Sequence, residues 1–417
     1  MLPYQYPALP LPDTGKYTRL LRLSPGDFSD ELHVELEQVL LDGTFNYEAL
    51  SYVWGSTDHL VSILVGPSRE YTISVTQNLA TALQHLRNAN ESRVLWVDAV
   101  CIDQSNLAER SYQVTLMSDI FRAASRVTVW LGPEEDDSFY AINAMHAIGS
   151  SIDVDWINFT FKPRVSVNNP SSSAIEKLQD YRFRDKEASA VNRLLHRQWF
   201  ERLWIRQEIG LATHAIIHCG KLTIPWHLFR SAVFFIHSKS HKLMSALGAH
   251  QYASFLSRLV LMWRICRDRV YRLQHLRIQL AQVVCTDPRD MIYGILSLLP
   301  KSQQAMGIVP DYTLDVALVY QDATLRFINY TKKLNILVQC ELQAISSHVP
   351  TWVPDWSIDL ETTPITGSVI NASAGFEAIA TIKEKGTLCV VGVPTATIRD
   401  VLPMHFDESE DHFRTML

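Results

Sequence analysis

Short apolar runs alternate with longer helical patterns over the first half of the chain, from about residue 18 to 220. The runs RVLWVD (93–98) and RVTVWLG (126–132) are continuously apolar, as expected for strands that are covered on both faces. Between them, residues 109–124 place apolar side chains at helical spacing. This alternation predicts an α/β fold with a mainly parallel sheet wrapped by helices. The strands expected to share that sheet are 47–53, 93–98, 126–131 and 214–219.

Other segments in this half predict hairpins and one exposed insertion. Residues 18–23 and 32–41 are typical of strands that flank a turn, and VSILVG with REYTISV predicts a second hairpin around Gly-Pro. Thr76 is a candidate N-cap for a helix that runs through Arg87. The polar insertion at about 133–190 includes VSVNNPSSSAIEK, which is typical of an exposed loop.

The pattern changes after about residue 225. Helical periodicity covers about 225–300 and 314–331, and residues 376–398 are β-rich around an EKG turn. We therefore expect two domains, 1–222 with the α/β fold and 223–417 as a mainly helical annex with a short β tail. The last residues, DESEDHFRTML, follow no predicted packed element, and a truncated C-terminus is expected.

Composition narrows the class of protein. A chain of 417 residues exceeds one ordinary core, and 47% hydrophobic with 20% charged residues is typical of a folded protein. A net charge of −6 gives no general attraction to nucleic acid. The sequence contains no apolar stretch long enough to predict a membrane span. Its six cysteines lie far apart and form no C-x-x-C motif, which favours reduced thiols over disulfide bonds or a zinc site. We expect a cytoplasmic protein without a metal or cofactor.

Candidate chemistry lies where the predicted strands end, because ligands of such sheets bind beyond the carboxyl ends of the strands. Two of these ends offer carboxylates, aromatic rings and a glycine that allows close approach, a set that suits a sugar and a flat ring. The residues are Ser51, Tyr52, Trp54 and Gly55 after the first strand, and Asp98 and Asp103 after the second. Alternatively, the two aspartates are loop caps and the tryptophans fill the core.

Glu208 is unusual within WFERLWIRQEIGLA (199–212). If this stretch is one helix, Glu208 shares a face with Trp204 and Leu211. A carboxylate in an apolar stripe is unfavourable unless it is paired, protonated or used. A buried ion pair with an arginine from another element and a functional carboxylate are both compatible with the pattern.

Three blocks resemble the fungal heterokaryon-incompatibility (HET) domain. They are YEALSYVWG, RVLWVDAVCIDQSNLAERSYQVTLMSDIFRAASRVTVWLG and RQWFERLWIRQEIGLA, and the wider likeness spans about residues 18–357. This resemblance implies a role in non-self recognition, in which fusion of incompatible cells triggers programmed cell death as a form of innate immunity.

The same blocks are similar, more distantly, to TIR domains, which are flavodoxin-like signalling modules that include NAD-cleaving enzymes. That likeness implies a TIR-like fold and points to Glu208 as the catalytic residue, with NAD as substrate. The long insertion and a second block without the usual arginine-glycine step depart from the TIR pattern.

Two functions follow from the resemblance. In the first, Glu208 is partly buried, faces a cavity at the strand ends and stabilises the transition state of NAD cleavage. Tyr52 and Trp54 then shape the nicotinamide pocket, Asp98 or Asp103 meets hydroxyls, and Ser51, Gly55 and Trp204 complete the substrate site. In the second, the domain is a non-enzymatic module that signals by self-association. Either function allows an incompatibility partner protein and requires no nucleic acid.

Overall fold

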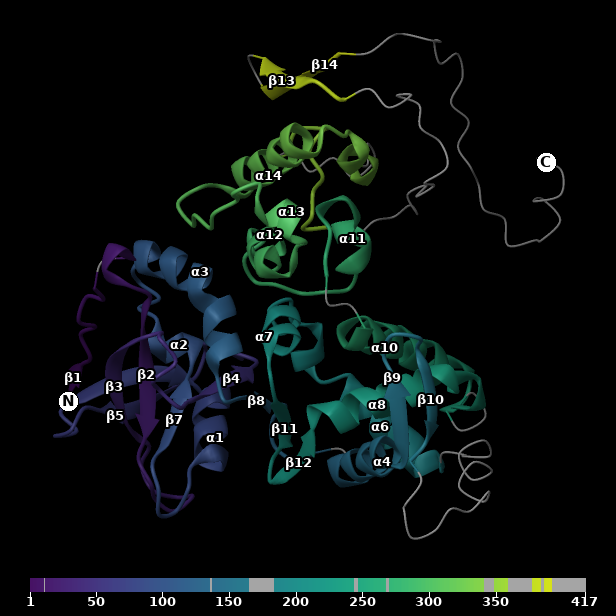
Figure 1. Ribbon diagram of the computed structural model, residues 1–417. Helices are drawn as coiled ribbons and strands as arrows, with labels where there is room; N and C mark the ends of the chain where they lie inside the picture. Colours follow the sequence, from purple (N-terminus) through teal and green to yellow (C-terminus); the bar gives the residue numbers. More distant parts are fainter. Residues whose placement is uncertain are drawn as a thin grey trace.

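A ten-stranded sheet forms the centre of the N-terminal half of the protein (Figure 1). The computed structural model describes residues 1–10, 12–135, 137–164, 184–243, 247–267, 270–340, 349–358, 377–383 and 386–391. Within them the sheet has the order β1-β6-β5-β3-β2-β7-β4-β8-β11-β12. Its strands are β1 (Leu2–Pro3), β2 (Tyr17–Leu23), β3 (His33–Leu40), β4 (Glu48–Tyr52), β5 (Leu60–Val65), β6 (Tyr71–Thr76), β7 (Arg93–Trp96), β8 (Arg126–Trp130), β11 (Ala215–Cys219) and β12 (Leu222–Pro225).

The four strands expected to share a sheet are neighbours in it, in the order β7-β4-β8-β11, and all three of their pairings are parallel. Ala49 of β4 pairs with Trp96 on one side and with Val127 on the other. This confirms the predicted parallel core. Since parallel strands share one direction, their carboxyl ends meet at a single edge of the sheet.

Antiparallel hairpins extend the parallel core. β2 pairs with β3 and β5 with β6, as the sequence predicted, and β12 turns back on β11 at the other edge. Connections this short cannot form a parallel crossover, so these pairs must be antiparallel.

Two helices of the sheet region begin at residues whose side chains cap them. Thr76 accepts a hydrogen bond from the backbone N–H of Leu79 at the start of α1 (Gln77–Leu86), which confirms the predicted cap. Asn106 caps α3 (Leu107–Ala123), and the one-turn α2 (Asp98–Cys101) directly follows β7.

The stretch 199–212 does not form one helix. It consists of the 3₁₀ helix η2 (Gln198–Glu201) and α7 (Ile205–Leu211), with Arg202 in extended conformation between them. Backbone bonds from Leu203 N to Val284 O and from Val284 N to Glu201 O hold this break. A single strand-like bridge to a distant segment therefore interrupts the helix that local periodicity predicts.

The insertion contributes to a helical lobe beside the sheet (Figure 1). The elements of the lobe are α4 (Ser138–Ser151), β9 (Ile152–Asp155), β10 (Thr160–Pro163), α6 (Asp185–Leu195), α8 (Trp226–Ser238) and α10 (Ala249–Arg267). α4 packs against both α6 and α8, so residues from before and after the predicted division at 222 share this core. The predicted exposed loop at 165–177 lies outside the described residues.

Short helices and one long helix form a third group, above the sheet and the lobe in Figure 1. These are α11 (Leu276–Gln279), α12 (Asp290–Tyr293), α13 (Lys301–Gln304) and α14 (Val316–Thr331), with the 3₁₀ helices η4 (Leu273–His275), η5 (Leu296–Leu298) and η6 (Asn335–Gln339). The 3₁₀ helix η3 (Ser240–Leu243) lies between α8 and α10 in the chain, and η1 (Pro12–Thr14) lies near the N-terminus. β13 (Ala380–Lys383) and β14 (Thr387–Val390) form the β-hairpin of the predicted tail. No helix in the described ranges combines the length and apolarity that a membrane crossing requires.

Gly149 sets the approach of α4 to α8. A Cβ atom at this position would lie 2.1 Å from the carbonyl oxygen of Leu228. Gly149→Ala should therefore separate the two helices and lower the free energy of unfolding by about 3 kcal/mol or more. Chemical denaturation of this variant and of Asn143→Ala, an exposed position on the same helix, measures the effect. Equal stability of the two variants would contradict this packing.

Candidate functional site

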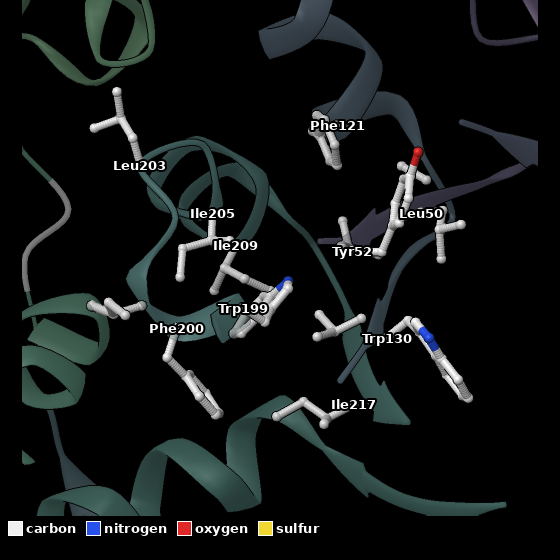
Figure 2. Close-up of a cluster of buried hydrophobic side chains, with 14 of the residues drawn as sticks. Leu50, Tyr52, Phe121, Trp130, Trp199, Phe200, Leu203, Ile205, Ile209 and Ile217 are labelled. Atoms are coloured by element: carbon white, nitrogen blue, oxygen red, sulfur yellow. The ribbon is translucent and has the colours of Figure 1, made fainter. Parts of the chain in front are cut away.

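A chain of hydrogen bonds joins Trp199, Ser51 and Glu208 at the carboxyl edge of the parallel strands. The indole N–H of Trp199 donates to Ser51 Oγ at 2.8 Å, and the Ser51 hydroxyl donates to Glu208 Oε2. Ser51 lies near the end of β4, whereas Trp199 comes from η2 and Glu208 from the first turn of α7. Figure 2 shows Trp199 among buried apolar side chains, including Ile205 and Ile209 of α7.

Glu208 is deeply buried, with 3% of its surface exposed. The prediction that it is partly buried and faces the cavity is wrong. The break at Arg202 starts α7 afresh, and this turns the side chain of Glu208 inward onto Ser51. The carboxyl group therefore replaces contact with water by one hydrogen bond.

The nearest cation only partly compensates for this burial. Arg202 Nη1 lies 3.7 Å from Glu208 Oε1, beyond hydrogen-bond distance, and has no hydrogen-bond partner within the described residues. Burial raises the pKa of Glu208 to about 7, although Arg202 and the Ser51 hydroxyl act in the opposite direction and Asp98 adds to the rise. Desolvation therefore outweighs the arginine at this carboxyl group.

Asp98 and Trp54 lie on the exposed side of this cluster. The indole N–H of Trp54 donates to Asp98 Oδ2 at 2.8 Å, and the Trp54 ring is 40% exposed. Burial also raises the pKa of Asp98, against the charge of Arg202. Tyr52 is buried beside them, and burial together with the charge of Asp98 raises the pKa of its hydroxyl. Of the predicted residues, the structure thus brings Ser51, Tyr52, Trp54, Asp98 and Glu208 together.

Two predicted site residues point elsewhere. Asp103 Oδ1 accepts hydrogen bonds from the backbone N–H and the hydroxyl of Ser105, which is the loop role considered as the alternative. Trp204 donates its indole N–H to Asp290 of α12 at 3.0 Å, so its polar edge faces the C-terminal annex. Neither residue joins the Glu208 cluster.

A pocket of about 800 Å³ lies beside the cluster, at the carboxyl ends of β4 and β8. Gly55 lines it with φ of +81°, a conformation that side chains disfavour, together with Trp130 and Trp199. Glu208 does not line this pocket. The carboxylate and the pocket therefore share only Trp199, which reaches Glu208 through Ser51.

Sequence reasoning missed the other wall of this pocket. Asn192, Arg193 and His196 come from α6 and its end, and Arg197 donates to the carbonyls of Leu131 and Pro133. The helical spacing of apolar residues in α6 (Asp185–Leu195), with residues 188, 191, 194 and 195 buried, was a usable signal at the end of the insertion. In the described part of the chain, no group of three or more His, Cys, Asp or Glu side chains could hold a metal ion.

The raised pKa of Glu208 predicts an unusual effect of pH on stability. Its folded pKa of about 7 exceeds the ordinary value of 4.5, so the folded state loses stability as pH rises between these values. Glu208→Gln removes this penalty of about 3 kcal/mol. The variant should melt at a higher temperature than the wild type at pH 8, and the difference should shrink at pH 5.

Glu48 provides a matched control, because its pKa is lowered whereas that of Glu208 is raised. Burial alone would raise the pKa of Glu48, but hydrogen bonds from Arg126, Arg93 and Thr128 lower it to about 2. Glu48→Gln should therefore destabilise the protein at pH 7, and the loss should diminish as pH falls below 4.5 toward 2. Melting curves of both variants across this pH range test the pair. If Glu208→Gln lowers the melting temperature at pH 8, the attraction of Arg202 for the Glu208 carboxylate outweighs the cost of its burial.

Comparisons with known proteins relate the segment that carries this site to one family. Residues 47–208 match the family model described as heterokaryon incompatibility protein (HET). The chain is 28% identical over 406 residues to heterokaryon incompatibility protein 6, OR allele, of Neurospora crassa, covering 85% of this chain and 60% of that relative. No solved structure matches, so the TIR likeness rests on the sequence blocks alone. The matched span contains β4, Ser51 and Glu208, and over this span the chain is similar to the HET family.

Proposed function

We propose that this protein acts in fungal heterokaryon incompatibility and triggers programmed cell death after fusion of unlike cells. The matching family model and the name of the Neurospora relative support the incompatibility role. The chain spans about 60% of the length of that relative. The cell-death step follows from the family resemblance of the sequence blocks.

At the molecular level, the proposed reaction is cleavage of the bond between nicotinamide and ribose in NAD. The observation that carries this proposal is the Ser51–Glu208 pair, a carboxyl group with a pKa of about 7 at the carboxyl edge of the sheet. Strongly perturbed carboxyl groups concentrate at functional sites. The transition state of glycosidic cleavage carries positive charge on the sugar, which an ionised carboxylate in a water-poor site stabilises.

The neighbouring side chains suit the rest of the substrate. The half-exposed ring of Trp54 offers a face for the nicotinamide, and Asp98 offers an acceptor for a ribose hydroxyl. Glu208 is nearly inaccessible and Arg202 lies beside its carboxyl group, so a neighbouring side chain such as Arg202 must move before the substrate can reach it. The proposal therefore includes a local opening on binding.

The enclosure of Glu208 favours a second candidate function. Ser51 and Arg202 surround the carboxyl group, and the adjacent pocket does not reach it. In this case Glu208 is structural and the domain acts as a non-enzymatic module that signals by self-association.

NAD turnover separates the two candidates. Concentrated purified protein is incubated with NAD, and free nicotinamide is measured by chromatography. Turnover should require Glu208, because Glu208→Gln keeps the shape but removes the charge. The control Glu201→Gln removes a carboxylate from the same segment that pairs with Arg258, and it should keep turnover. Absence of nicotinamide from the wild type at concentrations where it oligomerises would support the assembly module instead.

The dependence of turnover on pH gives an independent check. Because Glu208 acts ionised and has a pKa of about 7, kcat should rise as pH increases through 7 and then level off. A rate that is already constant from pH 5 upward would exclude a carboxyl group with this pKa as the essential residue.

A further inference from the structure

A second pocket lies at the amino ends of the parallel strands, whereas Glu208 lies at their carboxyl ends. Its volume is about 580 Å³, within the usual range for small-molecule sites. The first residues of β8 and β11 line it, together with the β9–β10 hairpin and the first turns of α8. This is the amino edge of the parallel strands, so the pocket is separate from the proposed NAD site.

The lining of this pocket is basic, although the whole chain carries a net charge of −6. The charged side chains that line it are three arginines (Arg126, Arg164 and Arg230) and one aspartate (Asp153). Arg126 and Arg164 keep nearly half of their side chains exposed while they pair with Glu48 and Asp153. Guanidinium groups have five N–H donors, so one ion pair leaves capacity for an anion.

The start of α8 adds donors to the same pocket. α8 begins at Trp226, and no side chain caps its N-terminus. Such an end presents free backbone N–H groups and the positive end of the helix dipole, which bind phosphate well. In addition, the indole N–H of Trp226 is a buried donor without a hydrogen-bond partner among the described residues, and Trp226 lines the pocket with 7% of its surface exposed.

Aromatic surface lies next to these donors. The guanidinium of Arg230 stacks over the ring of Trp156 at 3.4 Å, and both side chains line the pocket. Stacking fixes the plane of the guanidinium, which pre-organises it for a planar or tetrahedral anion. We propose that this pocket binds a small phosphorylated ligand of nucleotide size, with the phosphate held by its arginines and by the N-terminus of α8.

Titration calorimetry with ADP, pyrophosphate and adenosine tests the site on the full chain. ADP and pyrophosphate should bind and adenosine should not, because the phosphates supply the recognised charge. Binding should weaken as salt increases. Adenosine binding as tightly as ADP, or no binding of either phosphate compound at low salt, would overturn the proposal.

Two variants locate the binding. Arg164→Gln removes one arginine whose ion pair is exposed, and His227→Glu places a carboxylate in the first turn of α8, where the helix dipole favours it. Each should raise the Kd for ADP by at least about tenfold. Lys221→Gln removes the same charge as Arg164→Gln from an exposed position outside the pocket and should leave Kd unchanged. An unchanged Kd in both pocket variants would place the anion elsewhere and refute the site.

Discussion

The hydrogen bond between Ser51 and the buried carboxyl group of Glu208 determines how the helix α7 packs against the sheet. The Ser51 hydroxyl accepts a hydrogen bond from the indole N–H of Trp199 and donates one to the Glu208 carboxyl group. One hydroxyl group therefore connects β4, η2 and α7. A buried acceptor without such a partner would be strongly unfavourable, and this fixes the depth and rotation of α7. The arginine that would make a conventional ion pair lies too far away to donate a hydrogen bond. A carboxyl group with a pKa raised to about 7 is the consequence.

The two edges of the parallel core differ in chemistry. At the carboxyl ends of the strands, burial raises the pKa of both Asp98 and Glu208, and the charge of Asp98 adds to the rise at Glu208. At the amino edge, arginines and the free start of α8 concentrate positive charge. Ile209 of α7 and Ala212, directly after its end, line the basic pocket, so one short helix borders both regions.

The sequence predicted the parallel core because its strands are continuous apolar runs, which few other structures accommodate. Because the carboxyl ends of parallel strands lie on the same side of the sheet, Ser51, Trp54 and Asp98 were expected near one another, and the structure brings them together; their role in a substrate site stays a prediction. The depth of Glu208 could not be predicted, because the break at Arg202 depends on a bridge to Val284, far away in the chain. Trp204 was misplaced for a similar reason, since its partner Asp290 lies in the annex. The α6 wall of the large pocket was missed because no helix was assigned to the end of the polar insertion, after the stretch at 165–177 that was interpreted as an exposed loop.

Direct titration of the Glu208 carboxyl group tests the central claim that desolvation outweighs Arg202. Infrared difference spectra between wild type and Glu208→Gln, recorded across pH, isolate the carbonyl band of this one protonated side chain. We predict that the band disappears with a midpoint near pH 7. A carboxylate that stays ionised down to pH 4.5 would show that the arginine dominates, and it would contradict the account of both the site and its stability.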